Sequence, residues 1–363
     1  MQKKLIALAI AGLASTAVFA QSNVTIYGIA DVYAGHASAD GKTSQNVINS
    51  GGWSGSRLGF KGSEDLGDGL KTIFVLEYGL NMDANSGIGA PEVTAANTVA
   101  TGTQARQQLV GLTGNFGTAV AGRAQTAGYD FSNVVNPLHG TAFNPTKAVY
   151  TGLGGTLVNS DSRANNAFVY TSPDFNGFKV AYNHARVTEA ANANGAVVGG
   201  SAKDNTANLL SGTYTSGPLA LTAIYTRVTM DATVANDDVK ELGFGGSYDF
   251  GMVKLHADYQ TTQVGSASKN KLWALGATVP VSAAGNVVFS YAANKKDSSA
   301  ASDNTKAWTL AYQHNLSKRT MLYAAYERVT NDTAAANGVT VGSLTPTAGG
   351  EVTQTVAGIR HTF

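Results

Sequence analysis

Apolar and polar residues alternate with a period of two along most of the chain, which is the pattern of half-buried β-strands. Within 251–263, for example, Leu255 and Tyr259 fall on one face and His256 falls on the other. About sixteen such segments can be placed, and no segment after residue 20 has a convincing helical period. They lie at 23–36, 53–65, 69–82, 103–114, 117–125, 162–172, 177–188, 205–216, 218–230, 238–249, 251–263, 268–280, 286–296, 304–315, 318–330 and 350–363. The pattern predicts an all-β fold.

The connections between these segments alternate between short and long. Short ones lie at 67–69, 115–117, 174–176, 216–217 and 315–318, and long ones at 37–52, 83–102, 126–161, 189–204 and 331–349. Antiparallel strands with short turns at one rim and long loops at the other are typical of transmembrane barrels. No linker or composition break divides the chain into two domains.

The composition separates two architectures that both alternate, a soluble sandwich and a transmembrane barrel. Only 13% of the residues are charged, against about 25% in average soluble domains. A sandwich turns its polar face to bulk water and is usually richly charged, whereas a barrel needs an apolar outer band and a polar lumen. Backbone groups in hydrocarbon must be paired internally, which closes the sheet. The 15 Tyr and 3 Trp suit aromatic girdles, so the composition favours the barrel.

The first twenty residues resemble a secretory leader. Lys3 and Lys4 precede an uncharged apolar run at 5–19, and small residues occupy the positions expected before a cleavage site. The alternative, a short membrane anchor, is disfavoured because the run is too short and its flanks are wrong. We therefore expect a signal peptide at 1–20 and a transmembrane β-barrel domain at 21–363. After the leader, no apolar run approaches the roughly 20 residues of a spanning helix.

Four segments resemble the Gram-negative general porin family, particularly its β-proteobacterial branch. They are 23–28 (NVTIYG), 54–67 (SGSRLGFKGSEDLG), 111–117 (GLTGNFG) followed by Gly122 and Arg123, and 359–363 (IRHTF). The resemblance implies a 16-stranded antiparallel transmembrane β-barrel in the bacterial outer membrane, reached by export through the periplasm. It also implies a homotrimer, contact with outer-membrane lipids, and passive diffusion of ions and small hydrophilic solutes. Sixteen strands normally leave an aqueous channel.

The last strand ends on a terminal aromatic residue, Phe363, with Ala357 and Ile359 on the same face. This arrangement resembles the signal that outer-membrane barrels present to the barrel-assembly machinery. An ordinary buried last strand would also explain a terminal Phe, whereas a terminal Phe together with the leader and the alternation is typical of an outer-membrane barrel.

In the porin family the third extracellular loop folds into the barrel and narrows the pore. The matching segment here is 125–161, and its aromatic residues favour a packed, inward loop over an external one. A long loop without strand periodicity is usually functional or disordered. Its only carboxylates are Asp130 and Asp161, which we assign with Glu77 to the acidic side of a constriction. No acidic Pro-Glu-Phe-type motif is present in the loop.

Opposite that loop the family places arginines on the barrel wall. Arg57 matches by motif, and Lys61 shares its face. Arg163 points inward if Phe168 faces lipid. Two further candidates, Arg106 and Arg123, match by position but have an ambiguous face unless a bulge intervenes.

An arginine on the lipid face costs about 2–4 kcal/mol at the midplane, so mid-strand arginines are expected to point into water. Each could instead form a structural ion pair in the lumen, for example with Glu77. Charges of one sign in a pore select ions of the other sign. We therefore predict a weak preference for anions.

The sequence carries no enzyme signature. It has no Cys, no Gly-x-Ser-x-Gly elbow, no phosphate-binding Gly loop and no His pair at metal-ligand spacing, so we expect no catalytic site, metal or cofactor. His256 with Asp258 is the one suggestive pair, and two polar lumen-lining residues explain it better. A formal net charge of +1 gives no basic field for nucleic acid. A substrate-specific porin, and less favourably an outer-membrane enzyme or adhesin, remain as alternatives.

Overall fold

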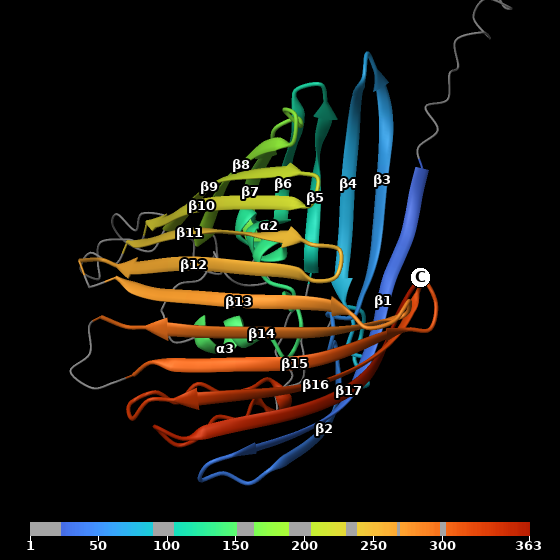
Figure 1. Ribbon diagram of the computed structural model, residues 1–363. Helices are drawn as coiled ribbons and strands as arrows, with labels where there is room; N and C mark the ends of the chain where they lie inside the picture. The colour runs from blue at the N-terminus through green and yellow to red at the C-terminus, as the bar shows by residue number, and fades with distance from the viewer. Residues whose placement is uncertain are drawn as a thin grey trace, which may run out of the picture.

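The computed structural model describes residues 23–89, 105–150, 163–188, 205–229, 238–266, 269–297 and 303–363, most of them in strands (Figure 1). The strands are β1 (Asn23–Ala39), β2 (Gln45–Ser50), β3 (Arg57–Gly67), β4 (Leu70–Gly79), β5 (Ala105–Gly114), β6 (Gly117–Gln125), β7 (Arg163–Thr171), β8 (Phe178–Thr188), β9 (Asn205–Ser216), β10 (Leu219–Thr229), β11 (Val239–Asp249), β12 (Lys254–Val264), β13 (Asn270–Pro280), β14 (Gly285–Lys295), β15 (Thr305–Asn315), β16 (Thr320–Asn331) and β17 (Glu351–Thr362). Two short helices, α2 (Ala127–Val135) and α3 (Pro145–Tyr150), and a 3-10 turn, η2 (Val341–Ser343), complete the described elements. None of the described helices has the length and apolar character needed to cross a membrane.

The sheet closes on itself through its first and last strands. Each strand pairs antiparallel with its neighbours, and β1 pairs with β17 as well as with β2 and β3. Because β2 and β3 both pair with β1, they are two halves of one barrel strand. The closed barrel therefore has 16 strands, as the sequence predicts.

Side chains alternate between the outer face and the interior along each strand. On β10, Leu221 and Tyr225 are exposed whereas Ile224 and Thr226 are buried. Large apolar side chains dominate the exposed set, as an outward band in hydrocarbon requires. Since half of each strand faces outward, the low content of charged residues follows directly from the architecture.

The short connections and both described ends of the chain lie at one rim. The turn at 67–69 uses left-handed backbone at three successive residues, Gly67 (φ 91°), Asp68 (φ 52°) and Gly69 (φ 77°), where glycine avoids steric strain. At the same rim, the Gly28 amide donates to the Phe363 carbonyl at 3.0 Å, and the Phe363 amide donates to the Gly28 carbonyl at 3.1 Å. This pair of hydrogen bonds fastens the last strand to the first.

The structure corrects the sequence prediction of a long loop at 37–52. Strand β1 continues to Ala39, and residues 45–50 form β2, which pairs with β1 from Val32↔Ser50 to Ala37↔Gln45. The segment is polar and short, so its strand character comes from the pairing and leaves little trace in the sequence. A break at 51–56 separates β2 from β3.

Segment 126–150 lies inside the barrel, with α2 and α3 surrounded by strands (Figure 1). Phe131 and Val135 of α2 form one buried cluster with Leu209 and Ile224 of the wall. Phe143 belongs to a second buried cluster together with wall residues from β13 to β17. Hydrogen bonds to the segment's backbone reinforce the packing, since Asn294 donates to the Val149 carbonyl at 2.9 Å and Thr309 donates to the Phe143 carbonyl at 2.8 Å.

Candidate functional site: a basic wall in the lumen

Three charged side chains from β3, β4 and β5 meet on the inner face of the barrel. Glu77 Oε1 lies 2.8 Å from Arg106 Nε and 3.9 Å from Arg57 Nη1. The second carboxylate oxygen accepts a hydrogen bond from the Tyr27 hydroxyl at 3.1 Å. Glu77 is 3% exposed, so its charge is held close between the two guanidinium groups. This local group carries one net positive charge.

Bulges lie beside Arg106 and Arg123. The register between β4 and β5 shifts between Glu77 and Tyr78, which leaves Arg106 without a direct partner in the strand pairing. The register between β6 and β7 shifts between Gly122 and Ala124, around Arg123. A bulge inserts an extra residue and re-aims the side chain beside it. The contact with Glu77 shows that Arg106 faces the lumen, and Arg123 lies near enough to Arg106 for the two charges to interact.

Arg123 is held by polar groups of its neighbouring strands. Its Nε donates to the Ala105 carbonyl and its Nη1 donates to Asn165 Oδ1, both at 2.5 Å. The adjacent residue Asn166 has a φ of 49°, the left-handed conformation that Asn tolerates better than most residues. The bulge geometry therefore fixes where this guanidinium lies.

Arg163 begins β7 and lies against α2. It stands opposite Gln125 in the strand register, and its Cζ is 5.3 Å from the centre of the Tyr129 ring. Gln125 Nε2 donates to Asp130 Oδ1 at 2.8 Å, which brings this loop carboxylate to the same wall. Desolvation by the surrounding wall and α2 raises the pKa of the Asp130 carboxyl, although its side chain keeps contact with the lumen, and the hydrogen bond from Gln125 opposes that rise.

Lys61 does not join this cluster. It stands opposite Thr25 in the register, four residues beyond Arg57 toward the 67–69 turn. Its Nζ lies 5.3 Å from the centre of the Tyr27 ring. Lys61 therefore lines the barrel nearer to the rim of short turns.

The acidic residues predicted for a facing wall are placed differently. Glu77 lies among the arginines, Asp130 lies beside Arg163 through Gln125, and Asp161 lies outside the described residues. Glu77 thus forms the ion pair in the lumen that the sequence offered as the alternative, and it does so with both Arg106 and Arg57.

Buried carboxylates on the far wall hold the internal segment or its neighbours. Glu241 accepts a hydrogen bond from the Tyr150 hydroxyl of α3, and Glu327 accepts one from Gln354. Gln354 also donates to the Ala142 carbonyl at 3.0 Å. Sequence analysis missed these residues, although their inward position in the strand alternation marks them.

Asp31 organises the break between β2 and β3, and sequence analysis did not identify it. Its carboxylate accepts hydrogen bonds from the backbone amides of residues 52, 53 and 54 at 3.0, 3.0 and 2.9 Å, and from the Tyr323 hydroxyl at 2.5 Å. The same break contacts the pore elements. The Gly55 carbonyl accepts from Arg57 Nε at 2.9 Å, and the Gly52 carbonyl accepts from the Ala142 amide at 2.8 Å.

A cavity of about 250 Å³ opens beside these groups. Its lining includes Arg57, Arg106, Lys147 and His139, together with backbone of the 51–56 break. At Gly55 an added Cβ would lie 3.1 Å from Arg106 Nη1, so glycine leaves room for that guanidinium. The space is polar and mostly positively charged, which suits water and anions.

His256 and Asp258 do not form a catalytic pair. His256 Nδ1 lies 3.1 Å from the Val134 carbonyl at the end of α2, and Asp258 accepts a hydrogen bond from Gln260 at 2.7 Å. Both therefore serve the packing of the inner face. Within the described ranges, no group of three or more His, Asp or Glu side chains could hold a metal ion.

Comparisons with known proteins agree with this architecture. Residues 7–334 match the family model described as Gram-negative porin. The chain is 32% identical over 378 residues to outer membrane porin protein 32 of Delftia acidovorans, covering 100% of both chains. It is 28% identical to an outer membrane porin protein of Bordetella pertussis, covering 89% of this chain and 93% of the relative. A solved anion-selective porin from Comamonas acidovorans superposes with a TM-score of 0.76 at 29% identity, covering 94% of this chain and 100% of that structure. The chain therefore belongs to the Gram-negative porins and forms a channel in the bacterial outer membrane.

Proposed function

We propose that this porin is a general diffusion channel with a weak preference for anions. The observation that carries the proposal is the arrangement of Arg57, Arg106, Arg123 and Arg163 on one side of the lumen, with Glu77 as the carboxylate in direct contact with two of them. The likeness to a porin named as anion-selective supports the same conclusion.

The constriction lies between this basic wall and segment 126–150. The loop helices pack on the opposite wall, so the free lumen is left on the arginine side, with Lys147 and His139 of the loop beside it. Guanidinium groups that line a narrow aqueous passage attract anions and repel cations. Glu77 and Asp130 offset part of this charge, which keeps the preference weak.

The proposal includes how the channel is exported and assembled. We infer that residues 1–20 are removed during export, that 21–363 form the mature barrel, and that the barrels assemble as homotrimers. A trimeric porin is among the structures with the same fold. The terminal strand that ends at Phe363 is the segment offered to the barrel-assembly machinery. We infer that the barrel conducts ions and small hydrophilic solutes and catalyses no reaction.

Planar-bilayer recordings under a salt gradient test the selectivity. Replacing both Arg57 and Arg163 by Ala should shift the reversal potential toward cation preference, because two positive charges leave the passage. Lys179→Ala combined with Lys318→Ala removes the same charge at the rim of short turns and should leave the potential near the wild-type value. An unchanged potential in the arginine variant would contradict the assignment.

Liposome swelling with solutes of graded size separates a general channel from a substrate-specific porin. A general channel should give rates that fall smoothly with solute size. Saturation of the rate by one solute would instead support the substrate-specific alternative.

A further inference from the structure

A row of basic side chains crosses the outer face of the barrel near the strand ends that enter the long loops. Each alternates with buried inward neighbours, so each points away from the lumen. We call this row the basic belt, and it consists of Arg227, Lys240, Lys271, Lys295, Lys306 and Arg328. On the described strands β1 to β7, by contrast, no lysine or arginine points outward at that end. Arg186, which is exposed near the loop end of β8 beside the buried Ala185, also lies on the outer face, so basic residues extend to β8 and the belt is their densest part, on β10 to β16.

The belt brings like charges directly opposite one another. Arg227 stands opposite Lys240 in the register of β10 and β11, and Lys271 stands opposite Lys295 in the register of β13 and β14. Like charges in such cross-strand positions destabilise a sheet. Two pairings of this kind on one face favour an external anion that binds between them.

Carboxylates of the chain compensate the belt only in part. Arg227 is paired with Asp238 at 2.7 Å, Lys271 with Asp297 at 2.8 Å, and Arg328 with Glu351. Among the residues that the structure describes, Lys240 and Lys306 form no ion pair. The belt thus keeps a net positive charge.

Aromatic pairs immediately below the belt set its depth in the membrane. Trp273 and Trp308 follow Lys271 and Lys306 by two residues on the same outer face. Each packs on a tyrosine of the next strand, with ring centres 5.1 Å apart for Trp273–Tyr291 and 5.4 Å for Trp308–Tyr326. Such girdles mark the boundary between hydrocarbon and headgroups. The belt therefore lies at the headgroup level of the outer leaflet, on the side of the long loops.

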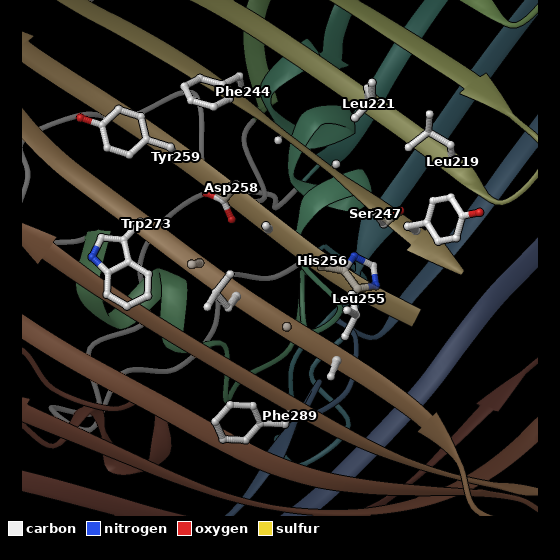
Figure 2. A pocket seen from close by; sticks show the side chains of 18 of the residues that line it. Leu219, Leu221, Phe244, Ser247, Leu255, His256, Asp258, Tyr259, Trp273 and Phe289 are labelled. Atoms are coloured by element: carbon white, nitrogen blue, oxygen red, sulfur yellow. The ribbon is translucent and has the colours of Figure 1, made fainter. Parts of the chain in front are cut away.

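From Trp273 toward the short turns, the outer face contains a hollow of about 750 Å³ (Figure 2). Gly246 and Ala257, which stand opposite each other in the register, form its floor, and aromatic and leucine side chains form its walls. Figure 2 shows Phe244, Tyr259 and Trp273 projecting from neighbouring strands around it. The lining is apolar, so its fitting occupant in the membrane is hydrocarbon.

The belt and the hollow are separated by the depth of one lipid chain. Gly246 follows Lys240 by six positions on β11, which is about 20 Å along the strand at about 3.3 Å per residue. A strand tilt of about 35–45° reduces this to about 15 Å along the membrane normal. That is half of a hydrocarbon core of about 30 Å, the depth to which one acyl chain reaches.

We propose that the outer face of β10–β16 binds a phosphate-bearing lipid of the outer leaflet. The basic belt binds the lipid phosphates, an acyl chain runs past the aromatic pairs, and its end fills the hollow over Gly246 and Ala257. The inference does not depend on the ion preference of the channel, because the belt points away from the lumen.

Native mass spectrometry of the detergent-solubilised barrel tests the phosphate part of the proposal. The probes are diphosphoryl lipid A, monophosphoryl lipid A and phosphatidylcholine. Diphosphoryl lipid A should bind most tightly, and the Lys240→Gln, Lys271→Gln, Lys295→Gln triple variant should bind it at least ten-fold more weakly. Phosphatidylcholine, which carries no net charge, should bind wild type and variant alike.

A matched triple variant at the other rim controls for total charge. Lys179→Gln, Lys318→Gln and Arg319→Gln remove the same three charges beside the short turns and should leave lipid A binding unchanged. Equal binding by the two triple variants would overturn the assignment of the belt. Wild-type conductance of each variant in planar bilayers verifies that the barrel is folded.

The hollow is tested separately by Ala257→Leu, which extends an outward side chain into it. This variant should weaken lipid A binding several-fold, whereas Ala324→Leu, on the outer face of β16 away from the hollow, should not. Equal binding by these two variants would overturn the acyl-chain site.

Discussion

Glu77 holds a negative charge between two guanidinium groups of the pore wall, so a single residue sets much of the local field. In Glu77→Gln the charges of Arg57 and Arg106 are no longer offset. We expect the anion-to-cation permeability ratio to rise roughly two-fold or more, since unopposed charge in a narrow aqueous passage acts directly on permeant ions. Reversal potentials measured in a salt gradient give the ratio.

Glu64→Gln provides the control for that change, because Glu64 is an exposed carboxylate of the same sheet near the 67–69 turn. Its variant should keep the wild-type ratio. If Glu77→Gln and Glu64→Gln behave alike, then Glu77 does not contribute to the field in the passage.

Asp130 gives the channel a pH dependence of defined sign. Confinement raises its pKa, so the carboxylate takes up a proton at a higher pH than an ordinary Asp when the solution is acidified. Loss of this negative charge beside Arg163 should increase anion preference as the pH falls through the raised pKa. Asp130→Asn should show the higher preference already at neutral pH and lose this part of the pH profile. A profile identical to that of wild type would contradict the role of Asp130.

At the scale of elements, the break at 51–56 joins β1, the basic wall and the internal segment. Asp31 holds the break through backbone amides, and the Gly52 carbonyl accepts from Ala142. The amide of Asn in Asp31→Asn has one oxygen that can accept these hydrogen bonds, and an NH2 group that cannot accept takes the place of the second oxygen. We expect a loss of roughly 1–3 kcal/mol in the free energy of unfolding, because buried amides are left unpaired. Thermal unfolding measures this loss, and increased current noise in single-channel recordings should accompany it. Wild-type stability and noise together would refute the anchoring role.

The internal segment 126–150 packs closely against β13 at a glycine, Gly276. An added Cβ at Gly276 would lie 2.7 Å from the Pro137 ring, too close for the ring to stay in place. Gly276→Ala should therefore push residues near Pro137 into the lumen and lower the single-channel conductance. At Gly212 an added Cβ meets only ordinary contacts at 3.5 Å, so Gly212→Ala should conduct as wild type. Equal conductance in both variants would contradict the close contact between Gly276 and Pro137.

The elements that the sequence predicts well are those whose evidence is local. Alternation places β10 to β16 within a few residues, because each strand carries its own apolar outer face. The bulges at Arg106 and Arg123 depend on the register with a neighbouring strand, so the local pattern leaves their faces undetermined. The expectation of no helical segment after residue 20 is wrong for α2 and α3. In α2 the buried residues Ala127, Phe131 and Val135 recur every four positions, but a helix of nine residues is too short for this period to stand out, and α3 has only six residues. Asp31 looks like any inward polar residue until the break at 51–56 is seen beside it.

At the scale of the whole molecule, the barrel is closed by the contact between its two ends. The Phe363 ring lies over Gly28, where an added Cβ would fall 2.2 Å from the ring and 2.7 Å from the Arg57 carbonyl oxygen. Gly28 and Phe363 also exchange two backbone hydrogen bonds. The terminal aromatic therefore has a place in the folded barrel that is separate from any recognition by the assembly machinery.

Two variants distinguish closure from recognition. Gly28→Val removes the seat of the ring but keeps the terminal aromatic, whereas Phe363→Ala removes the aromatic itself. If the contact closes the barrel, both variants should refold more slowly than wild type into detergent micelles, where no assembly machinery is present. If the aromatic is also recognised, Phe363→Ala should show the larger loss of folded barrel in cells.

The folded fraction is measured by the mobility shift between heated and unheated samples on gels. If Gly28→Val refolds in micelles at the wild-type rate, the contact of the ring with Gly28 does not limit closure. If the two variants lose the same fraction of folded barrel in cells, Phe363 is not recognised separately by the assembly machinery.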